Sequence, residues 1–339
     1  MVLEQTINCY RPYYAMFVYP FKGNKTLVCT CFCNTFKREN SLIIDKEIRQ
    51  VWNSKQFRFQ RLLVSSKDWH FCKGASCEFY NREEELAGSN IIKNAINNKK
   101  TRLDYFPLFL NLSPSFACNN NCYFCCNAAF RKEGILRLKG DTMKEIKQYF
   151  VPYAEWIAIS GGEPFVAPES IELINWVLTY YPQKELSVLT NGTLLHNFGL
   201  QKIIQSNMKL KISLFGMSRG TYIKNTQSNN YDKVFENINH LISLRFKKMI
   251  LVFLLNKDNI SDLENFYKFI EKNEDTSGIV QTEMFAGRKL WNAAYQINNK
   301  YPHLSEKIKF NNRNEGLLKR ITRRLYNPFH FVRYCFANI

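Results

Sequence analysis

Three cysteines near the middle of the chain have a spacing that suits iron–sulfur chemistry. Cys118, Cys122 and Cys125 are separated by three and then two residues, so a short loop can wrap them around one small object such as a [4Fe-4S] cluster. Three thiolates leave the fourth iron without a protein ligand, and a cofactor or substrate can bind there. A zinc knuckle is the alternative interpretation of the same thiols.

Cys126 directly follows this triplet. If its thiol ligated the fourth iron, no position would remain open for a cofactor. Side chains of adjacent residues usually point in different directions. We therefore expect Cys126 to be packed or to face solvent.

A second motif, Gly161-Gly-Glu-Pro164, lies further along the chain. Together with the triplet it resembles the signature of the radical S-adenosylmethionine (SAM) enzymes. The resemblance implies that SAM chelates the open iron through its amino and carboxylate groups. It also implies that the backbone of Gly161 and Gly162 receives the SAM amino group, with Glu163 nearby.

The same resemblance assigns roles to four further residues. Phe124 would pack on the adenine or shield the cluster from water. Asn191 and Ser213 would offer hydrogen bonds to the ribose or carboxylate of SAM, and Arg288 would lie against the same groups, although Lys289 could serve equally. As single residues these are weaker signals, since Asn-Gly is also a common tight turn.

The chemistry implied by the resemblance is radical chemistry. The reduced cluster cleaves SAM to a 5'-deoxyadenosyl radical, which abstracts hydrogen from a substrate C–H bond, and an electron donor such as flavodoxin or ferredoxin supplies the electron. We expect a peptide or protein substrate. The alternative is dehydrogenation or epimerisation of a carbohydrate or other small molecule, and RNA modification and a non-enzymatic Fe–S protein are minor alternatives.

Apolar runs alternate with amphipathic ones after residue 105, which predicts an α/β fold, a partial (β/α)6 TIM-like barrel. The predicted strands are 107–112, 156–160, 186–190, 210–214, 249–255 and 279–283, and the predicted helices are 142–150, 168–180, 199–206, 231–244 and 261–272. The candidate residues follow the carboxyl ends of these strands, where barrel enzymes place their sites. We therefore expect the candidate residues to meet at one rim.

The first 90 residues form a predicted cysteine-rich α+β module. A strand over 26–33 would point Cys29, Cys31 and Cys33 to one face. A helical stretch over 46–54 and the pair Cys72 and Cys77 follow. This order resembles the SPASM or twitch domains of radical SAM enzymes, which implies an auxiliary Fe–S cluster held by a subset of the five cysteines. A structural zinc site and unligated core thiols are the alternatives.

Charge and composition complete the predicted organisation. The net charge is +18, and residues 288–339 hold 11 basic and 2 acidic residues. We expect a linker over 91–105, the barrel over 106–290 and a basic helical extension over 291–339. This extension could contact a membrane surface or an acidic partner. No secretory signal is evident at the start, so we expect a cytoplasmic protein.

Overall fold

A computed structural model describes residues 10–31, 41–45, 47–68, 89–125, 127, 134–273, 281–284, 288–304 and 308–310. The chain divides into two compact units. The first contains the described residues up to 115 together with 135–161, and the second contains those of 116–134 and 162–310. Cys33, Cys72, Cys77, Cys126 and most of the basic extension lie outside the described residues.

The first unit begins with antiparallel strands and continues with parallel ones. Its strand order is β3-β2-β1-β4-β5, where β1 pairs antiparallel with β2 and parallel with β4. Its elements are η1 (Arg11–Tyr13), β1 (Ala15–Phe21), β2 (Lys25–Cys29), β3 (Ser41–Ile44), η3 (Ile48–Asn53), α1 (Lys55–Ser65), α2 (Asn90–Asn97), β4 (Phe109–Leu112), α4 (Gly140–Glu145), η4 (Ile146–Phe150) and β5 (Trp156–Ile159).

The second unit is built from parallel strands in the order β6-β7-β8-β9-β10. Its elements are α5 (Pro168–Tyr180), β6 (Glu185–Thr190), α6 (Leu195–Phe198), α7 (Leu200–Gln205), β7 (Met208–Leu214), α8 (Arg219–Thr226), α9 (Tyr231–Ser243), β8 (Met249–Phe253), η5 (Ile260–Asp262), α10 (Leu263–Lys272), β9 (Gln281–Met284), α11 (Arg288–Lys300), η6 (Pro302–Leu304) and β10 (Ile308–Phe310).

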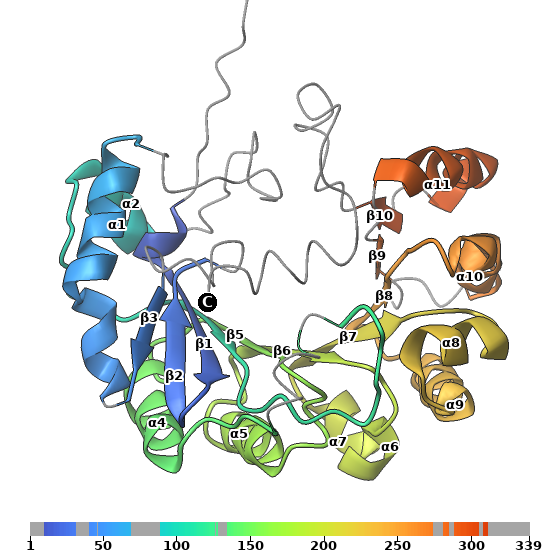
Figure 1. Cartoon of the computed structure of the whole chain (residues 1–339), viewed down its shortest axis with the longest axis horizontal. Helices are drawn as coiled ribbons and strands as arrows, with labels where there is room; N and C mark the ends of the chain where they lie inside the picture. Colours follow the sequence, from blue (N-terminus) through green and yellow to red (C-terminus); the bar gives the residue numbers. More distant parts are fainter. Residues whose placement is uncertain are drawn as a thin grey trace, which may run out of the picture. The chain divides into compact units, whose positions relative to one another are not determined.

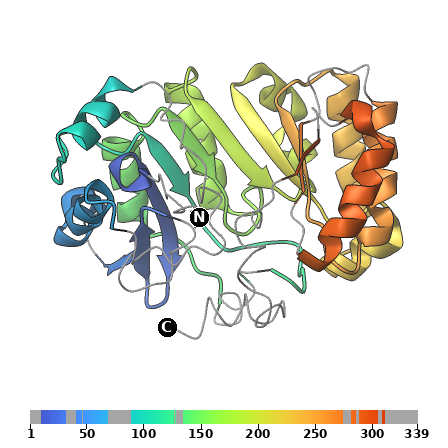
Figure 2. The same ribbon diagram turned by 90° about the horizontal axis from the view of Figure 1, so that it is seen from above.

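The helices of the second unit cover one face of its strands (Figure 1). Every second residue of β7, from Met208 to Leu214, is buried, while the intervening Lys209, Lys211 and Ser213 are partly exposed. Residues at every second position of a strand share a face, so the apolar half of β7 packs against the helices. The carboxyl-terminal helices α10 and α11 lie side by side (Figure 2), joined by the Tyr267 hydroxyl and the Asn298 amide oxygen at 3.1 Å.

The predicted fold class is confirmed: the protein is an α/β protein with the strand–helix succession of a partial TIM-like barrel. Each of the six predicted barrel strands is present, as β4 to β9. Helical residues 48–53 also appear as expected, with Ile48, Val51 and Trp52 buried. Among the described residues, no helix is long and apolar enough to cross a membrane.

The strand that carries Cys29 is shorter than predicted. β2 ends at Cys29, where its pairing with Phe17 of β1 also ends. The next residue, Thr30, is bent away and donates its hydroxyl proton to the Gln60 side chain over 2.8 Å. The alternation expected over 26–33 therefore stops before Cys31.

A buried arginine organises the helical part of the first unit. The Arg61 guanidinium is fully buried and donates to the carbonyl oxygens of Pro12, Trp52 and Thr101 over 2.7–2.9 Å. It also lies 4.4 Å from the ring centre of Trp52. One side chain thus ties α1 to three separate segments.

Replacing Arg61 with Lys should lower the free energy of unfolding by about 3 kcal/mol, because an ammonium group cannot reach these carbonyls in a fixed fork and leaves buried acceptors unsatisfied. Denaturant unfolding of the variant would measure this loss. The exposed Arg58 of the same helix provides the matched control, since Arg58→Lys should leave stability unchanged. Equal stability of the two variants would contradict a structural role for Arg61.

Candidate functional site

The cysteine triplet belongs to the second unit, where the Gly-Gly-Glu-Pro motif packs against the segment leading into it. A Cβ atom added to Gly162 would lie 2.0 Å from the carbonyl oxygen of Ala117. The Glu163 amide donates a hydrogen bond of 2.7 Å to the same oxygen. Because no side chain fits between the two backbones, glycine is required at 162.

Gly161 meets a similar constraint within the first unit. Its φ is +118°, and a Cβ atom there would lie 2.4 Å from the carbonyl oxygen of Ser115. The neighbouring hydroxyl oxygens of Ser113 and Ser160 lie 3.1 Å apart, just after β4 and β5. Both glycines therefore permit close backbone approach, a role that differs from, and is compatible with, the predicted reception of a ligand's amino group.

Glu163 is a buried carboxylate that joins two loops. It is 1% exposed and accepts hydrogen bonds from the Thr190 hydroxyl (2.7 Å), the Phe165 amide (3.2 Å) and the Asn191 amide (2.6 Å). Burial raises the pKa of Glu163 to about 7, and the three donors oppose the rise. The side chain thus fixes the loop after β6 instead of projecting into open space.

Asn191 connects that loop to the cysteine triplet. Its amide nitrogen Nδ2 donates to Oδ1 of Asn119 over 2.8 Å, and its Oδ1 accepts from the Thr193 amide and hydroxyl. The Asn119 amide in turn donates to the Thr193 hydroxyl over 2.8 Å. In this structure the Asn191 side chain holds the cysteine loop in place, so any contact with SAM would add to these bonds or replace them.

The other two asparagines between Cys118 and Cys122 contact α8 and the residues after it. Asn120 is 5% exposed; it accepts from the Asn230 amide (3.1 Å) and donates to the Tyr222 hydroxyl (3.5 Å). The backbone amide of Asn121 donates to the Thr226 carbonyl oxygen over 2.9 Å. The three asparagines thus anchor the loop in three directions.

Aromatic residues anchor the second half of the triplet. The Tyr123 hydroxyl donates to Asp258 over 2.5 Å, and Asp258 also pairs with Lys224 at 2.8 Å. The rings of Phe124 and Phe215, which follows β7, have their centres 5.3 Å apart. Phe124 is therefore partly covered by protein, consistent with either of its expected roles.

The three cysteines of the triplet differ in exposure. Cys122 is buried, while Cys118 and Cys125 are partly exposed, and among the described residues no three His, Cys, Asp or Glu side chains form a ready metal site. The Asn120 amide nitrogen lies 3.4 Å from Sγ of Cys118, within hydrogen-bond range for sulfur. Thiolates with backbone amide donors suit an anionic iron–sulfur cluster, so the donor set fits this group.

The other two predicted site residues, Ser213 and Arg288, both lie in elements of the second unit. Ser213 is the penultimate residue of β7, on the face opposite the helices, and pairs in register with Val252 of β8. Arg288 is the first residue of α11.

Of the amino-terminal cysteines, the structure describes Cys29 and Cys31, which belong to the first unit. Cys29 is buried at the end of β2, and Cys31 is partly exposed. Gln60 is 2% exposed, and its amide nitrogen has no hydrogen-bond partner in the part of the chain that the structure describes. Since Gln60 accepts from Thr30, between the two cysteines, this unsatisfied donor lies close to them in the fold.

Sequence patterns alone did not assign roles to Asn119, Asn120, Asn121 or Tyr222. The sequence signal for them was the run of three asparagines between Cys118 and Cys122. This run did not stand out, because asparagine is common throughout the chain.

The radical SAM family model matches residues 112–270. A probable GTP 3',8-cyclase of Saccharolobus solfataricus is 27% identical over 166 residues, which are 49% of this chain and 53% of that protein. The molybdenum cofactor biosynthesis protein moc-5 of Caenorhabditis elegans is 20% identical over 206 residues, 58% of this chain and 34% of that protein. The chain thus spans about half, or less, of these relatives.

Among solved structures, SuiB of Streptococcus suis bound to the precursor peptide SuiA is 14% identical in sequence to this chain. The two structures have a TM-score of 0.49, over 97% of this chain and 78% of SuiB. The enzyme anSMEcpe with bound AdoMet has 15% identity and a TM-score of 0.47, over 60% of this chain and 63% of that one. The segment that matches the radical SAM family model, residues 112–270, contains the anchored cysteine triplet and the Gly-Gly-Glu-Pro motif.

Proposed function

We propose that this protein is a radical SAM enzyme in which Cys118, Cys122 and Cys125 hold a [4Fe-4S] cluster and SAM binds beside it. The observation that carries the proposal is the anchoring of the triplet by Asn119 and Asn120 to the loop after β6 and to α8. When bound, the cluster supplies the electron for reductive cleavage of SAM, and the product removes hydrogen from a substrate C–H bond.

The chain's own residues position these groups. Gly162 lets the backbone after β5 approach the triplet segment, and Glu163 holds the loop that carries Asn191. Phe124 and Phe215 form an apolar surface next to Cys125, which suits a purine ring or the exclusion of water. Ser213 and Arg288 are proposed to contact the ribose or carboxylate of SAM.

The proposed substrate is a peptide or protein, and the outcome an oxidative modification. The support is the order of elements in the first 90 residues, which resembles modules of peptide-modifying enzymes, and the net charge of +18, which favours acidic partners. The curated relatives favour a second candidate, a small molecule such as a nucleotide, because those proteins are named GTP 3',8-cyclases.

An auxiliary Fe–S cluster in the first unit would make an oxidation possible by accepting an electron from the substrate. Cys29, Cys31 and the unsatisfied Gln60 amide support such a centre, since buried N–H donors stabilise cluster sulfur atoms.

Individual replacement of Cys118, Cys122 and Cys125 with Ala should abolish formation of 5'-deoxyadenosine from SAM under strong reductant, because each removes one cluster ligand. Chromatography of anaerobic reactions measures the product. Cys126→Ala is the matched control and should retain it. The assigned ligand set would be contradicted if the Cys126 variant lost the product while the triplet variants retained it.

Glu163→Gln should lower the free energy of unfolding by about 1–3 kcal/mol, because one acceptor oxygen becomes an NH₂ group facing buried donors. It should also raise the SAM concentration needed for half-maximal cleavage, since the loop carrying Asn191 loosens. Denaturant unfolding and SAM titration measure the two effects. The exposed Glu236 of α9 supplies the control variant Glu236→Gln, which should resemble wild type.

The pH dependence of stability gives an independent check on Glu163. Its folded pKa of about 7 exceeds the ordinary 4.5, so between these values the folded protein binds more protons than the unfolded chain. The free energy of unfolding contributed by this group should therefore fall as pH rises from 4.5 to 7. In Glu163→Gln this pH dependence should be absent. If the free energy of unfolding changed equally with pH in wild type and in Glu163→Gln over this interval, a buried, titrating carboxyl group at 163 would be contradicted.

Iron analysis of reconstituted protein should give about eight iron atoms per chain if both clusters form. A Cys29→Ser, Cys31→Ser double variant should fall to about four while still producing 5'-deoxyadenosine. About four iron atoms in the wild-type protein would remove the auxiliary cluster from the proposal.

A further inference from the structure

Tyr222 of α8 is a fully buried phenol beside the cysteine triplet. Its side chain is 0% exposed, and its hydroxyl accepts a hydrogen bond of 3.5 Å from the amide of Asn120. Asn120 stands midway between Cys118 and Cys122, and its backbone amide lies 3.4 Å from Sγ of Cys118. The phenol oxygen is therefore directed at the part of the loop that carries the first two thiols.

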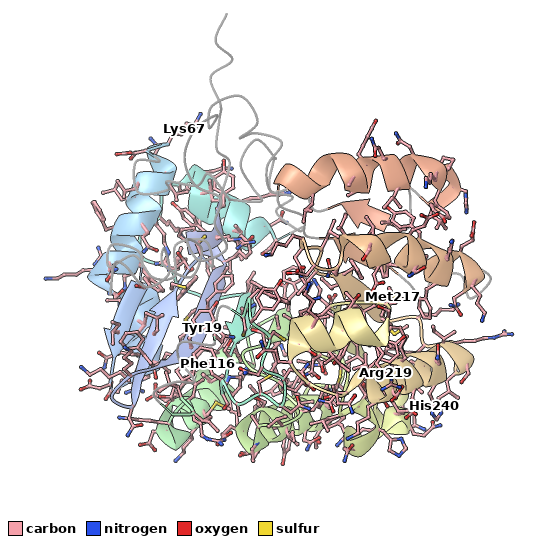
Figure 3. The ribbon with its side chains drawn as sticks, turned by 45° about the vertical axis from the view of Figure 1, so that its right-hand side comes forward. Tyr19, Lys67, Phe116, Met217, Arg219 and His240 are labelled. Atoms are coloured by element: carbon pink, nitrogen blue, oxygen red, sulfur yellow. The ribbon has the colours of Figure 1, made fainter. Side chains whose placement is uncertain are left out.

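The start of α8 is fixed, which restricts where Tyr222 can lie. Asp262 accepts hydrogen bonds from the backbone amides of Met217 (2.8 Å) and Ser218 (2.9 Å), in the turn before α8. Figure 3 labels Met217 in this turn and Arg219 at the start of α8. A Cβ atom on Gly216 would lie 2.7 Å from the Tyr222 amide nitrogen. The backbone of Tyr222 thus packs directly on the chain leaving β7.

The ring of Tyr222 is held from the side by Tyr231. The two ring centres are 5.8 Å apart in an edge-to-face arrangement, and the Tyr231 hydroxyl donates to the Met217 carbonyl oxygen over 2.7 Å. With backbone and ring both restrained, the hydroxyl has little freedom to turn away from the triplet.

The electrostatic surroundings of the hydroxyl agree with this placement. Burial raises the pKa of Tyr222 to about 12; the Asn120 hydrogen bond opposes the rise, and Cys122, Cys118 and Glu163 add to it. The Asn120 side chain that bonds the phenol belongs to the residue midway between Cys118 and Cys122, so the phenol lies beside the loop that carries both cysteines. It also remains protonated at neutral pH, so it can act as a donor.

A phenol can accept one hydrogen bond and donate another. The Asn120 amide uses the acceptor side of Tyr222, which leaves the O–H proton to be donated. Thiolate and sulfide sulfur atoms of a cluster accept such protons, and hydrogen bonds to these atoms shift the reduction potential upwards because they stabilise the more negative, reduced state.

We propose that the Tyr222 hydroxyl donates a hydrogen bond to a sulfur atom of the cluster held by Cys118, Cys122 and Cys125, and that this bond raises the reduction potential of the cluster. The inference rests on the proposed cluster-binding function. The Tyr222 hydroxyl would then act on the cluster directly and tune its electron transfer.

Tyr222→Phe removes the hydroxyl and keeps the ring. In anaerobically reconstituted protein, redox titration followed by electron paramagnetic resonance should show a lower midpoint potential than wild type at equal iron content. Electron–nuclear double resonance of the reduced cluster should lose one exchangeable proton coupling. Tyr267→Phe, which removes another buried hydroxyl from the second unit, should leave both measurements unchanged. An unchanged potential and proton coupling in Tyr222→Phe would overturn the proposal.

Replacement of Tyr222 by 3-fluorotyrosine tests the same bond if the phenylalanine variant binds too little iron. Fluorine acidifies the phenol and strengthens it as a donor, so the midpoint potential should rise above the wild-type value. A potential equal to or below wild type would contradict the hydrogen bond. Wild-type protein that holds no cluster at this triplet would overturn the proposed function as well, whereas a normal cluster insensitive to both substitutions refutes only the role of Tyr222.

Discussion

The carboxylate of Glu163 lies buried between the segment that follows the glycine pair and the loop that follows β6, and both donate hydrogen bonds to it. Its position depends in turn on Gly162, because the Glu163 amide can reach the Ala117 carbonyl only if no side chain stands between the two backbones. The Gly-Gly-Glu-Pro motif, whose sequence indicates a ligand-binding loop, therefore also has a structural role. It connects the cysteine segment to the loop carrying Asn191 and sets the distance between them.

Asparagine side chains connect the cysteine loop to these segments through further hydrogen bonds. Asn119 pairs with Asn191, and Asn120 reaches α8. Each amide is both donor and acceptor, so a run of asparagines can make hydrogen bonds in several directions at once without adding charge next to the cysteines. The loop is anchored at its asparagines, while Cys118 and Cys125 keep partial exposure.

Much of this organisation could be predicted from the sequence. The period-two burial of β7 and the apolar runs of β4 to β9 are local signals, and all six predicted strands are present. The cysteine spacing is local as well. The Asn119–Asn191 pair and the Tyr222 hydroxyl could not be predicted, because they join residues far apart in the chain through side-chain geometry that no periodicity encodes. The strand predicted over 26–33 was too long for a related reason. Its pairing with β1 ends at Cys29, and the sequence of one strand does not show where its partner strand ends.

The central claim is that Cys118, Cys122 and Cys125 hold a cluster with one iron open to SAM. The most direct measurement is the electron paramagnetic resonance spectrum of the reduced, reconstituted protein before and after SAM is added. A cluster with an open iron should give a [4Fe-4S]⁺ signal whose g values shift when SAM binds, and a Cys118→Ala variant should lack the shift. A signal that SAM leaves unchanged, in protein with a full complement of iron at the triplet, would contradict the claim.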